Sequence, residues 1–123
     1  MISESTLDKI FEPLVNTRNK RKYFRRWSMV EEAYYGLGHR IVTTNDDILV
    51  YHGGYVNGYK SEISINRKDK IGICVLTNAP SSLSGISIPS FWERYEQYKL
   101  RKNNPNPPTQ QADFLLPTTI TEH

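Results

Sequence analysis

Hydrophobic and polar positions follow a helical period at both ends of the chain and a strand-like pattern in the middle. In residues 5–15 the apolar side chains recur at helical spacing, which predicts one short helix with an apolar face. The apolar positions of this helix are Leu7, Ile10 and Phe11. Ser5 or Thr6 is suited to cap the helix at its start, and Pro13 is expected to stop it.

The middle of the chain predicts consecutive antiparallel strands. A β-branched run follows Gly36 and Gly38, so we expect a strand from about Leu37 to the Asn-Asp-Asp turn at 45–47. The next strand, at 48–52, is mostly apolar, as in a strand that is buried on both faces.

A glycine-rich corner is expected at 53–58, because its Asn-Gly pair favours the positive φ of tight turns. Residues 59–66 alternate imperfectly between apolar and polar side chains and predict a third strand. After the turn at 67–70, residues 71–78 predict a fourth, mostly buried strand, in which Gly72 allows close approach of a neighbour.

The C-terminal part predicts one helix and a tail. Residues 84–100 are expected to be helical at least from Pro89, which suits a first helical turn. The apolar face of this helix is expected to lie on the sheet and contains Ile88, Phe91, Trp92, Tyr95 and Tyr98. Residues 101–123 are rich in proline and lack periodicity, which predicts a disordered tail. The fold class is therefore α+β, an antiparallel β-meander of about four strands packed by a C-terminal helix.

Composition limits the classes of function. The chain has 123 residues, enough for at most one small domain, and its 37% hydrophobic residues supply one modest core. The single cysteine, Cys74, excludes an intrachain disulfide and a cysteine-based zinc site. No apolar run approaches the about 20 residues that cross a bilayer, and the N-terminus lacks the regions of a signal peptide. We expect no membrane segment, no metal and no cofactor, and the sequence predicts no compartment.

The net charge of +3 comes from a local basic segment, residues 18–26, in which basic and aromatic side chains alternate. Its basic residues are Arg18, Lys20, Arg21, Lys22, Arg25 and Arg26, and the aromatic residues in and beside it are Tyr23, Phe24 and Trp27. Such a mixture can bind phosphate backbones and stack on bases. Alternatively, it is a solvated connection whose aromatic side chains dock on the domain, and we favour this interpretation because no named nucleic-acid motif is present.

The order of motifs from Tyr35 to about Pro80, "YGLGHRI…YHGGYVNGYKSEISINRKDKIGICVLTNAP", resembles the C-terminal region of the serine β-lactamase and penicillin-binding-protein-like hydrolases. Members of this family carry a strand with a Lys-Thr-Gly or His-x-Gly triad, two further antiparallel strands ending in "LTN", and a C-terminal helix. The resemblance implies a partial β-lactamase/transpeptidase-like fold. It divides the chain into the end of a helical insert with a basic linker (1–34), a sheet-and-helix part (35–100) and the tail (101–123).

The resemblance also implies the roles of individual residues. His52, Gly53 and Gly54 correspond to the triad, which forms one wall of the active-site groove and binds substrate. Tyr55 would donate its backbone N–H to the oxyanion that develops during acyl transfer, the one catalytic contribution expected from this chain. His39, which replaces a frequent aromatic residue of the family, is interpreted as structural.

One departure from the family decides the expected activity. The family nucleophile lies in a Ser-x-x-Lys motif, in which the lysine activates the serine, and this sequence contains no such motif. Ser64 to Arg67 comes nearest, but it lies on an expected strand and ends in arginine, which cannot act as a base at ordinary pH. The strings Tyr55–Asn57 and Ser64–Asn66 match the second family motif by letter, but both follow the triad and are interpreted as coincidences.

The sequence therefore predicts a C-terminal fragment of a β-lactamase-related serine hydrolase, inactive alone. The expected partner is a separately encoded N-terminal half, which would cover the unpaired edge of the strand at 71–78 and restore a site for a small-molecule or peptide substrate. The alternatives are a non-enzymatic binding module that uses β-augmentation and, less favoured, a nucleic-acid binder that uses the basic segment.

Overall fold

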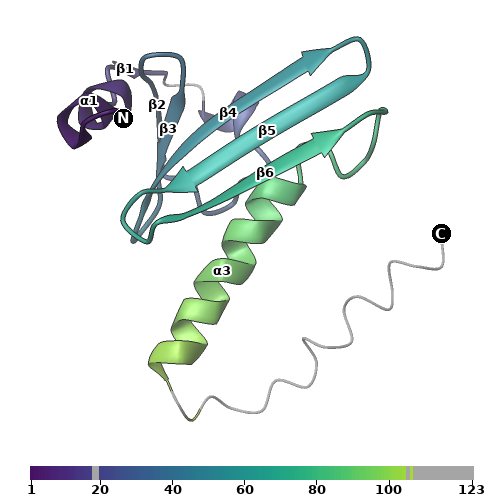
Figure 1. Cartoon of the computed structure of the whole chain (residues 1–123). Coiled ribbons are helices and arrows are strands. Elements are labelled where there is room, and N and C mark those ends of the chain that lie inside the picture. The colour runs from purple at the N-terminus through teal and green to yellow at the C-terminus, as the bar shows by residue number, and fades with distance from the viewer. Residues whose placement is uncertain (18–19, 105, 107–123) are drawn as a thin grey trace. The chain divides into compact units, whose positions relative to one another are not determined.

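The computed structural model of this protein describes residues 1–17, 20–104 and 106, and these form three helices and six strands (Figure 1). The helices are α1 (Glu4–Ile10), α2 (Lys20–Tyr23) and α3 (Ser87–Asn103). The strands are β1 (Val15–Asn16), β2 (Glu32–Tyr35), β3 (Arg40–Thr43), β4 (Ile48–Val56), β5 (Tyr59–Asn66) and β6 (Ile71–Thr77). The chain forms two compact units, Met1–Glu93 and Arg94–His123, so α3 begins in the first and continues into the second.

All six strands belong to one antiparallel sheet, in the order β1-β2-β3-β4-β5-β6. Each strand therefore pairs with its neighbour in sequence, and the predicted α+β class with an antiparallel meander is confirmed. The predicted number of about four strands is wrong. The sequence pattern missed β1, which has only two residues, and β2, whose Glu-Ala-Tyr-Tyr sequence has no clear alternation.

The strand predicted from about Leu37 begins later, at Arg40. Residues 36–39 form the turn between β2 and β3, in which the Gly36 N–H donates to the His39 carbonyl at 2.8 Å. Gly38 adopts a φ of +78° there, a conformation that side-chain-bearing residues rarely take. The two glycines thus belong to a hairpin turn and not to the start of a strand.

The corner predicted at 53–58 is wrong for most of its length, because β4 continues through Gly53 and Gly54 to Val56. The chain reverses only at Asn57 and Gly58, whose φ values of 48° and 85° match a type I′ turn. Such a two-residue turn needs no glycines before it, so the Gly-Gly pair is available for another purpose within the strand. In contrast, the bounds of β5 agree with the predicted third strand.

The prediction that the last strand is mostly buried is also wrong. Side chains of β6 alternate between half-buried and exposed along the whole strand. As predicted, β6 lies at the edge of the sheet.

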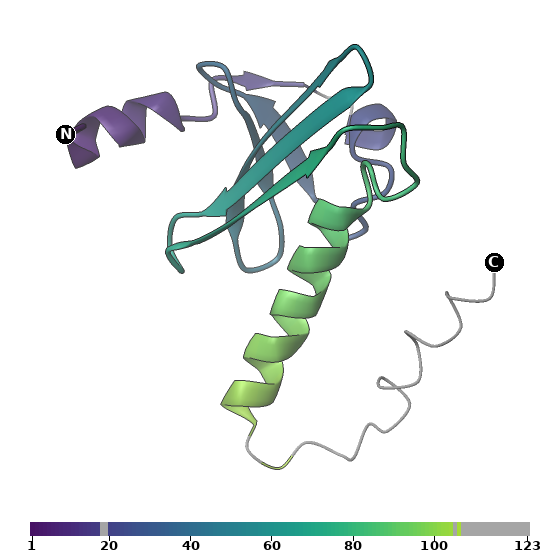
Figure 2. The same cartoon turned by 45° about the vertical axis from the view of Figure 1, so that its right-hand side comes forward.

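The first helix is shorter than predicted. It covers Glu4–Ile10, and its cap is Ser3, whose hydroxyl accepts the Thr6 N–H at 3.3 Å. No residue of α1 is fully buried. The helix lies beside the end of the sheet formed by β1 to β3 (Figures 1 and 2), where Asp8 forms an ion pair of 2.8 Å with Arg67.

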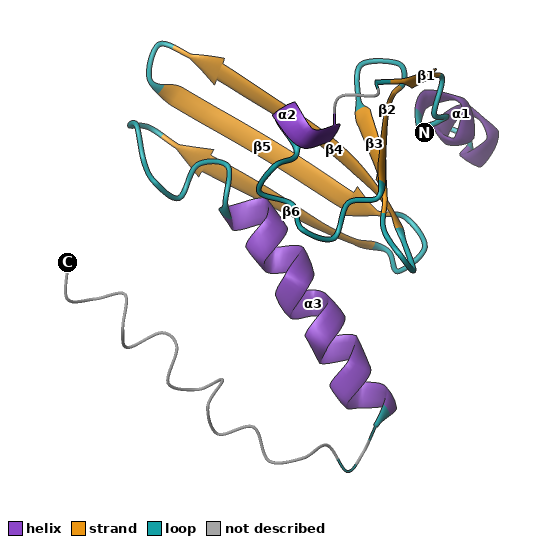
Figure 3. Ribbon diagram, turned by 180° about the vertical axis from the view of Figure 1, so that it is seen from behind, coloured by secondary structure: helices purple, strands orange, loops and turns teal. Residues whose placement is uncertain are grey.

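Most of the core lies between the sheet and the two segments that cover one of its faces, which we call the covered face; Ile41 and Val50 are buried on the opposite face. Phe24 and Trp27, which follow α2, are buried against Tyr51, and Figure 3 shows this segment crossing β4 and β5. The predicted docking of aromatic residues from the basic segment is therefore confirmed for Phe24 and Trp27, whereas Tyr23 is 48% exposed. The start of α3 buries Ile88 and Trp92 of the predicted apolar face, whereas Tyr98 of that face is 58% exposed.

β5 contributes polar side chains to this interior. Glu62, Ser64 and Asn66 are buried on the covered face, whereas Ile63, on the opposite face, is 42% exposed. Polar groups can be buried here because they have partners: Ser64 Oγ donates to the Val50 carbonyl at 2.9 Å and accepts the Trp92 indole N–H at 2.9 Å.

In the second unit, α3 continues to Asn103, so residues 101–103 of the predicted tail are helical. Tyr95 stacks on Tyr98 with ring centroids 6.3 Å apart, and Lys99 pairs with Glu96 at 2.8 Å. The rest of the predicted tail, apart from residues 104 and 106, lies outside the described residues. None of the described helices has the length and apolar character that a bilayer-crossing segment requires.

Candidate functional site

His52 lies on the face of the sheet opposite to the covered face, because side chains alternate along β4 and Tyr51 is buried beneath Trp27. The register places His52 beside Ile63 of β5, and Ile63 beside Cys74 of β6. All three are exposed. We call this surface the open face, and its residues on the last three strands are His52, Gly54, Val56, Tyr59, Ser61, Ile63, Cys74 and Leu76.

The two glycines after His52 have different surroundings. A methyl group on Gly53 would lie 2.6 Å from Tyr51 Oη on the covered face, so any larger residue there would displace the Tyr51 side chain. A methyl group on Gly54 would meet only Ser61 Oγ, at an ordinary contact distance of 3.5 Å. Within the described chain, therefore, packing explains Gly53 and does not explain Gly54.

The hydrogen-bonding direction of each β4 residue follows from its two hairpins. The type I′ turn makes Val56 of β4 and Tyr59 of β5 a hydrogen-bonded pair. Because the direction alternates along a strand, the backbone groups of Gly54 and His52 also point toward β5. On the other side the Thr44 N–H donates to the Asp47 carbonyl at 2.9 Å. Both hairpins thus direct the backbone groups of the odd-numbered residues of β4 toward β3.

β3 ends too early to pair with all of these groups. Arg40, the first residue of β3, lies opposite Tyr51, and the residues before Arg40 belong to the turn at Gly38 and do not pair with β4. The Gly53 and Tyr55 N–H groups therefore face a free strand edge, with no acceptor among residues 1–17, 20–104 and 106. Two donors on one strand edge, flanked by an exposed histidine, can hold a substrate carbonyl or an added peptide strand.

The contacts of the two histidines agree with separate roles. His39 packs edge-on against Phe11 at 5.2 Å, and its Nδ1 lies 3.0 Å from the Leu37 carbonyl, so it is part of the packing around α1. His52 contacts the His39 ring at 5.9 Å. The hydrogen bond to a nearby carbonyl that a purely structural His52 would make is absent from the described residues.

The structure brings no nucleophile to this edge. Ser64, in the string nearest to Ser-x-x-Lys, lies on the covered face, where its hydroxyl bonds to Val50 and Trp92. Ser61 is exposed beside Gly54, but no basic side chain hydrogen-bonds to it in the described part of the chain. Within the described residues no group of three or more His, Cys, Asp or Glu side chains could hold a metal ion.

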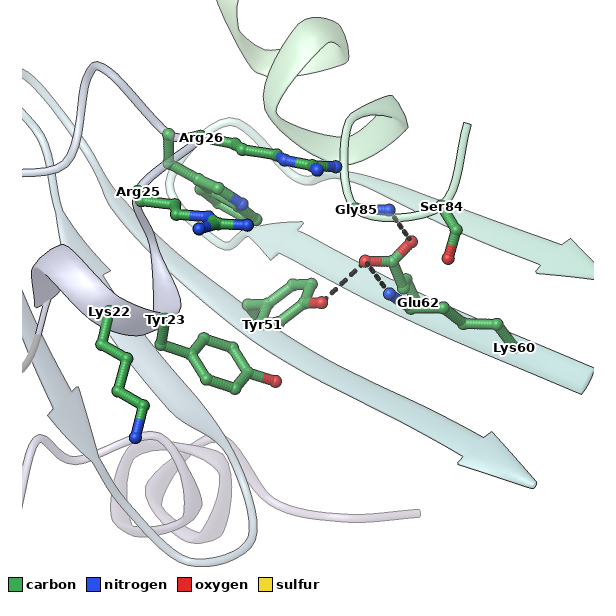
Figure 4. A pocket seen from close by; sticks show the side chains of 10 residues that line it. Lys22, Tyr23, Arg25, Arg26, Tyr51, Lys60, Glu62, Ser84 and Gly85 are labelled. Carbon is green, nitrogen blue, oxygen red and sulfur yellow. Dashed lines mark hydrogen bonds and ion pairs between the residues drawn. The ribbon is translucent and has the colours of Figure 1, made fainter. Parts of the chain in front are cut away.

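The sequence did not predict a cavity that lies on the covered face. It has a volume of about 360 Å³ (Figure 4), and we call it the basic pocket; its lining includes Arg25, Arg26, Tyr51, Lys60 and Glu62. Lys60 and Glu62, two residues apart in β5, were the only sign of this cavity in the sequence, and the burial of Glu62 became apparent only from the fold.

Glu62 is 3% exposed and fully engaged. One carboxylate oxygen accepts the Tyr51 hydroxyl at 2.7 Å and lies 3.8 Å from Lys60 Nζ, and the other accepts the Gly85 N–H at 3.3 Å. Burial, followed by the hydrogen bond to Glu62 and the charge of Glu62, raises the pKa of Tyr51 well above its usual value, so its phenol remains a neutral donor.

No protein-family model, curated protein sequence or solved structure matches the chain.

Proposed function

We propose that this chain is a C-terminal part of a β-lactamase-related serine hydrolase, in which β4 is the strand against which the substrate backbone lies. The proposal starts from the resemblance of residues 35–80 to that family. Alone, the chain is expected to hydrolyse nothing by the family mechanism, because its sequence contains no Ser-x-x-Lys motif.

The observation that carries the proposal is the free edge of β4. The Gly53 and Tyr55 N–H groups point away from β5 where β3 has ended, and His52 is exposed on the same strand. These are the positions at which the resemblance places the triad and the oxyanion donor. The space over Gly54, which packing in the chain does not require, would let a substrate or a partner approach the backbone closely.

Tyr55 would act through its backbone and not through its phenol. An oxyanion-hole donor must lie where negative charge develops, and loss of one such donor costs about 3 kcal/mol of transition-state stabilisation. The phenol of Tyr55 lies on the covered face, opposite to the face of His52, and is 65% exposed. Substitution of the side chain should therefore matter less than removal of the N–H.

A second polypeptide part would complete the site. The open face carries exposed apolar side chains on β4, β5 and β6, and among them Leu76 of β6 is 73% exposed. A helical part that packs there would bury this surface and bring its own serine and lysine to the free edge of β4. We propose this complementing part as the source of the nucleophile.

The test combines activity with matched substitutions at Tyr55. The purified chain should not turn over nitrocefin or p-nitrophenyl acetate. Mixing it with a co-purifying polypeptide that contains Ser-x-x-Lys should produce turnover of one of them. Tyr55→Pro, which removes the N–H at an unpaired position where proline is tolerated, should abolish this turnover, and Tyr55→Ala should retain it.

Turnover by the chain alone that Tyr55→Pro leaves unchanged would identify a contaminant. Equal activity of the Tyr55→Pro and Tyr55→Ala complexes would remove the backbone N–H from the mechanism and overturn the proposal.

A stand-alone binding module is the second candidate, and the free edge of β4 also favours it. An extended peptide could pair with Gly53 and Tyr55 by β-augmentation without any chemistry. This role predicts a monodisperse monomer with a cooperative thermal transition and no complementing partner. Light scattering together with a melt followed by circular dichroism separates the two candidates, because a chain that needs a second part should aggregate or melt without a transition.

A further inference from the structure

We propose that the basic pocket, on the covered face of the sheet, is a binding site for a small molecule that carries a phosphate group. The pocket lies on the covered face, whereas His52 and Gly54 lie on the open face. The proposal therefore does not depend on the proposed hydrolase function.

The first argument is that the arginines of the pocket are held in place. Arg25 and Arg26 stand between two buried aromatic residues, Phe24 and Trp27, which contact each other edge-on at 5.2 Å. Both rings also pack on Tyr51, at 5.9 and 5.0 Å. The backbone of a dipeptide anchored on both sides has little conformational entropy left to lose when an anion binds.

The second argument is the convergence of positive charge. Figure 4 shows Arg25 and Arg26 extending side by side toward the part of the pocket that contains Glu62 and Lys60. Arg26 Nη1 and Lys60 Nζ both lie within 4 Å of a single point, the position of a methyl group on Gly85. An anion near this point would therefore lie close to both positive charges.

The third argument is that the protein supplies too little negative charge here. Glu62 is the one carboxylate that lines the pocket among the described residues, and it already accepts from Tyr51 and Gly85. Arg25 and Arg26 make no ion pair with any described carboxylate. The uncompensated charge of the pocket therefore suits a dianion better than a monoanion.

The remaining donors fit phosphate. Guanidinium groups bind phosphate oxygens through pairs of N–H donors in a fixed geometry, and the Ser84 and Tyr23 side chains add hydroxyl groups at the wall. Arg40 stacks on the Tyr23 ring at 3.7 Å and so supports it from outside the pocket. A phosphate monoester with a small organic part would fit a volume of about 360 Å³.

The experiment is a titration of the isotope-labelled chain with inorganic phosphate, followed by nuclear magnetic resonance at a constant ionic strength of about 0.15 M. Saturable shifts should appear at the Gly85 amide, the Trp27 indole and the arginine side chains of the pocket. The double variant Arg25→Gln/Arg26→Gln should bind at least about tenfold more weakly, as loss of two charge-assisted hydrogen bonds predicts.

A matched control removes the same charge elsewhere. Lys9→Gln/Lys70→Gln lowers the net charge equally, at exposed positions in α1 and in the turn before β6, and should leave phosphate binding within about twofold of the original chain. Arg25→Lys/Arg26→Lys should recover part of the affinity because it keeps the charge. All variants should melt as the original chain does, because both arginines are exposed.

Shifts that are linear in phosphate concentration, spread over the surface or reduced equally by the control would overturn the proposal. A single-stranded oligonucleotide forms the last arm. Salt-sensitive binding of the oligonucleotide without saturable phosphate binding would also overturn it, in favour of a nucleic-acid surface on the basic segment.

Discussion

The phenol of Tyr51 occupies the space above Gly53, where a methyl group would lie 2.6 Å from the Tyr51 oxygen. The same phenol donates to Glu62 at 2.7 Å. Gly53 therefore leaves room for the hydrogen bond from Tyr51 to Glu62 in the basic pocket, and the two glycines after His52 face opposite sides of the sheet.

This relationship predicts opposite results for two neighbouring substitutions. Gly53→Ala should lower the free energy of unfolding by about 1–3 kcal/mol, because Tyr51 must move and weaken its bond to Glu62. Gly54→Ala should leave it unchanged or raise it slightly, since alanine restricts the unfolded chain and meets only Ser61 Oγ, at an ordinary contact distance. Urea denaturation of both variants checks the difference, and equal losses at the two positions would contradict the packing described for Gly53.

Tyr51 also predicts how stability depends on pH. Its pKa is raised in the folded chain above the usual value of about 10, so the folded state holds the proton more tightly than the unfolded state. This contribution is fully present below pH 10 and is lost as the pH rises above it. Chemical denaturation of the original chain at a series of pH values from 7 upward should therefore show a decline that begins near pH 10.

Tyr51→Phe is the matching variant for this decline. At pH 7 it should be less stable by about 1–3 kcal/mol, because Glu62 loses a buried hydrogen bond. The difference from the original chain should narrow above pH 10, where the phenol of the original chain begins to oppose folding. A constant difference across the whole range would show that Tyr51 does not titrate in the transition.

The hydrogen bond between Trp92 and Ser64 predicts an energetic coupling between α3 and the sheet. Trp92→Ala should cost about 3–5 kcal/mol, since its side chain is 2% exposed. A double-mutant cycle of Trp92→Phe and Ser64→Ala should give a coupling of about 0.5–1.5 kcal/mol. The same cycle with Ser61→Ala, on the open face, should be additive, and coupling there would mean that the effect is not specific to this bond.

The open face predicts self-association that depends on β6. Leu76→Lys should increase the monomer fraction in light scattering, because a charged side chain blocks edge-to-edge pairing and face-to-face apolar contact. Its effect on the free energy of unfolding should stay within about 0.5 kcal/mol. Leu37→Lys, at an exposed leucine in the β2–β3 turn, is the control; an equal effect of that variant would point to net charge instead of the open face.

The sequence predicted the sheet best where turns bracket a strand. The bounds of β5 agree with the prediction because an Asn-Gly turn precedes it and a charged turn follows it. The glycines of β4 misled the pattern, since a glycine pair usually marks a turn. Here the pair remains in the strand, and Tyr51 fills the space above Gly53.

The candidate site was only partly predictable. His52 and the residues after it were found by resemblance, but the free direction of the Tyr55 N–H depends on where β3 ends. The basic pocket could not be predicted at all. It joins residues of the basic segment to Lys60 and Glu62, and a buried glutamate with a lysine neighbour looks like an ordinary solvent-exposed pair in a sequence.

The consecutive order of the strands has a consequence for how the chain acquires its structure. Every strand pairs with its sequence neighbour, and from β2 to β6 each hairpin can close over a short loop at low entropic cost as soon as its second strand is available. Trp92 is the late contact, because it must return across 28 residues to reach Ser64. We therefore expect the sheet to form rapidly and to remain loosely packed until α3 docks.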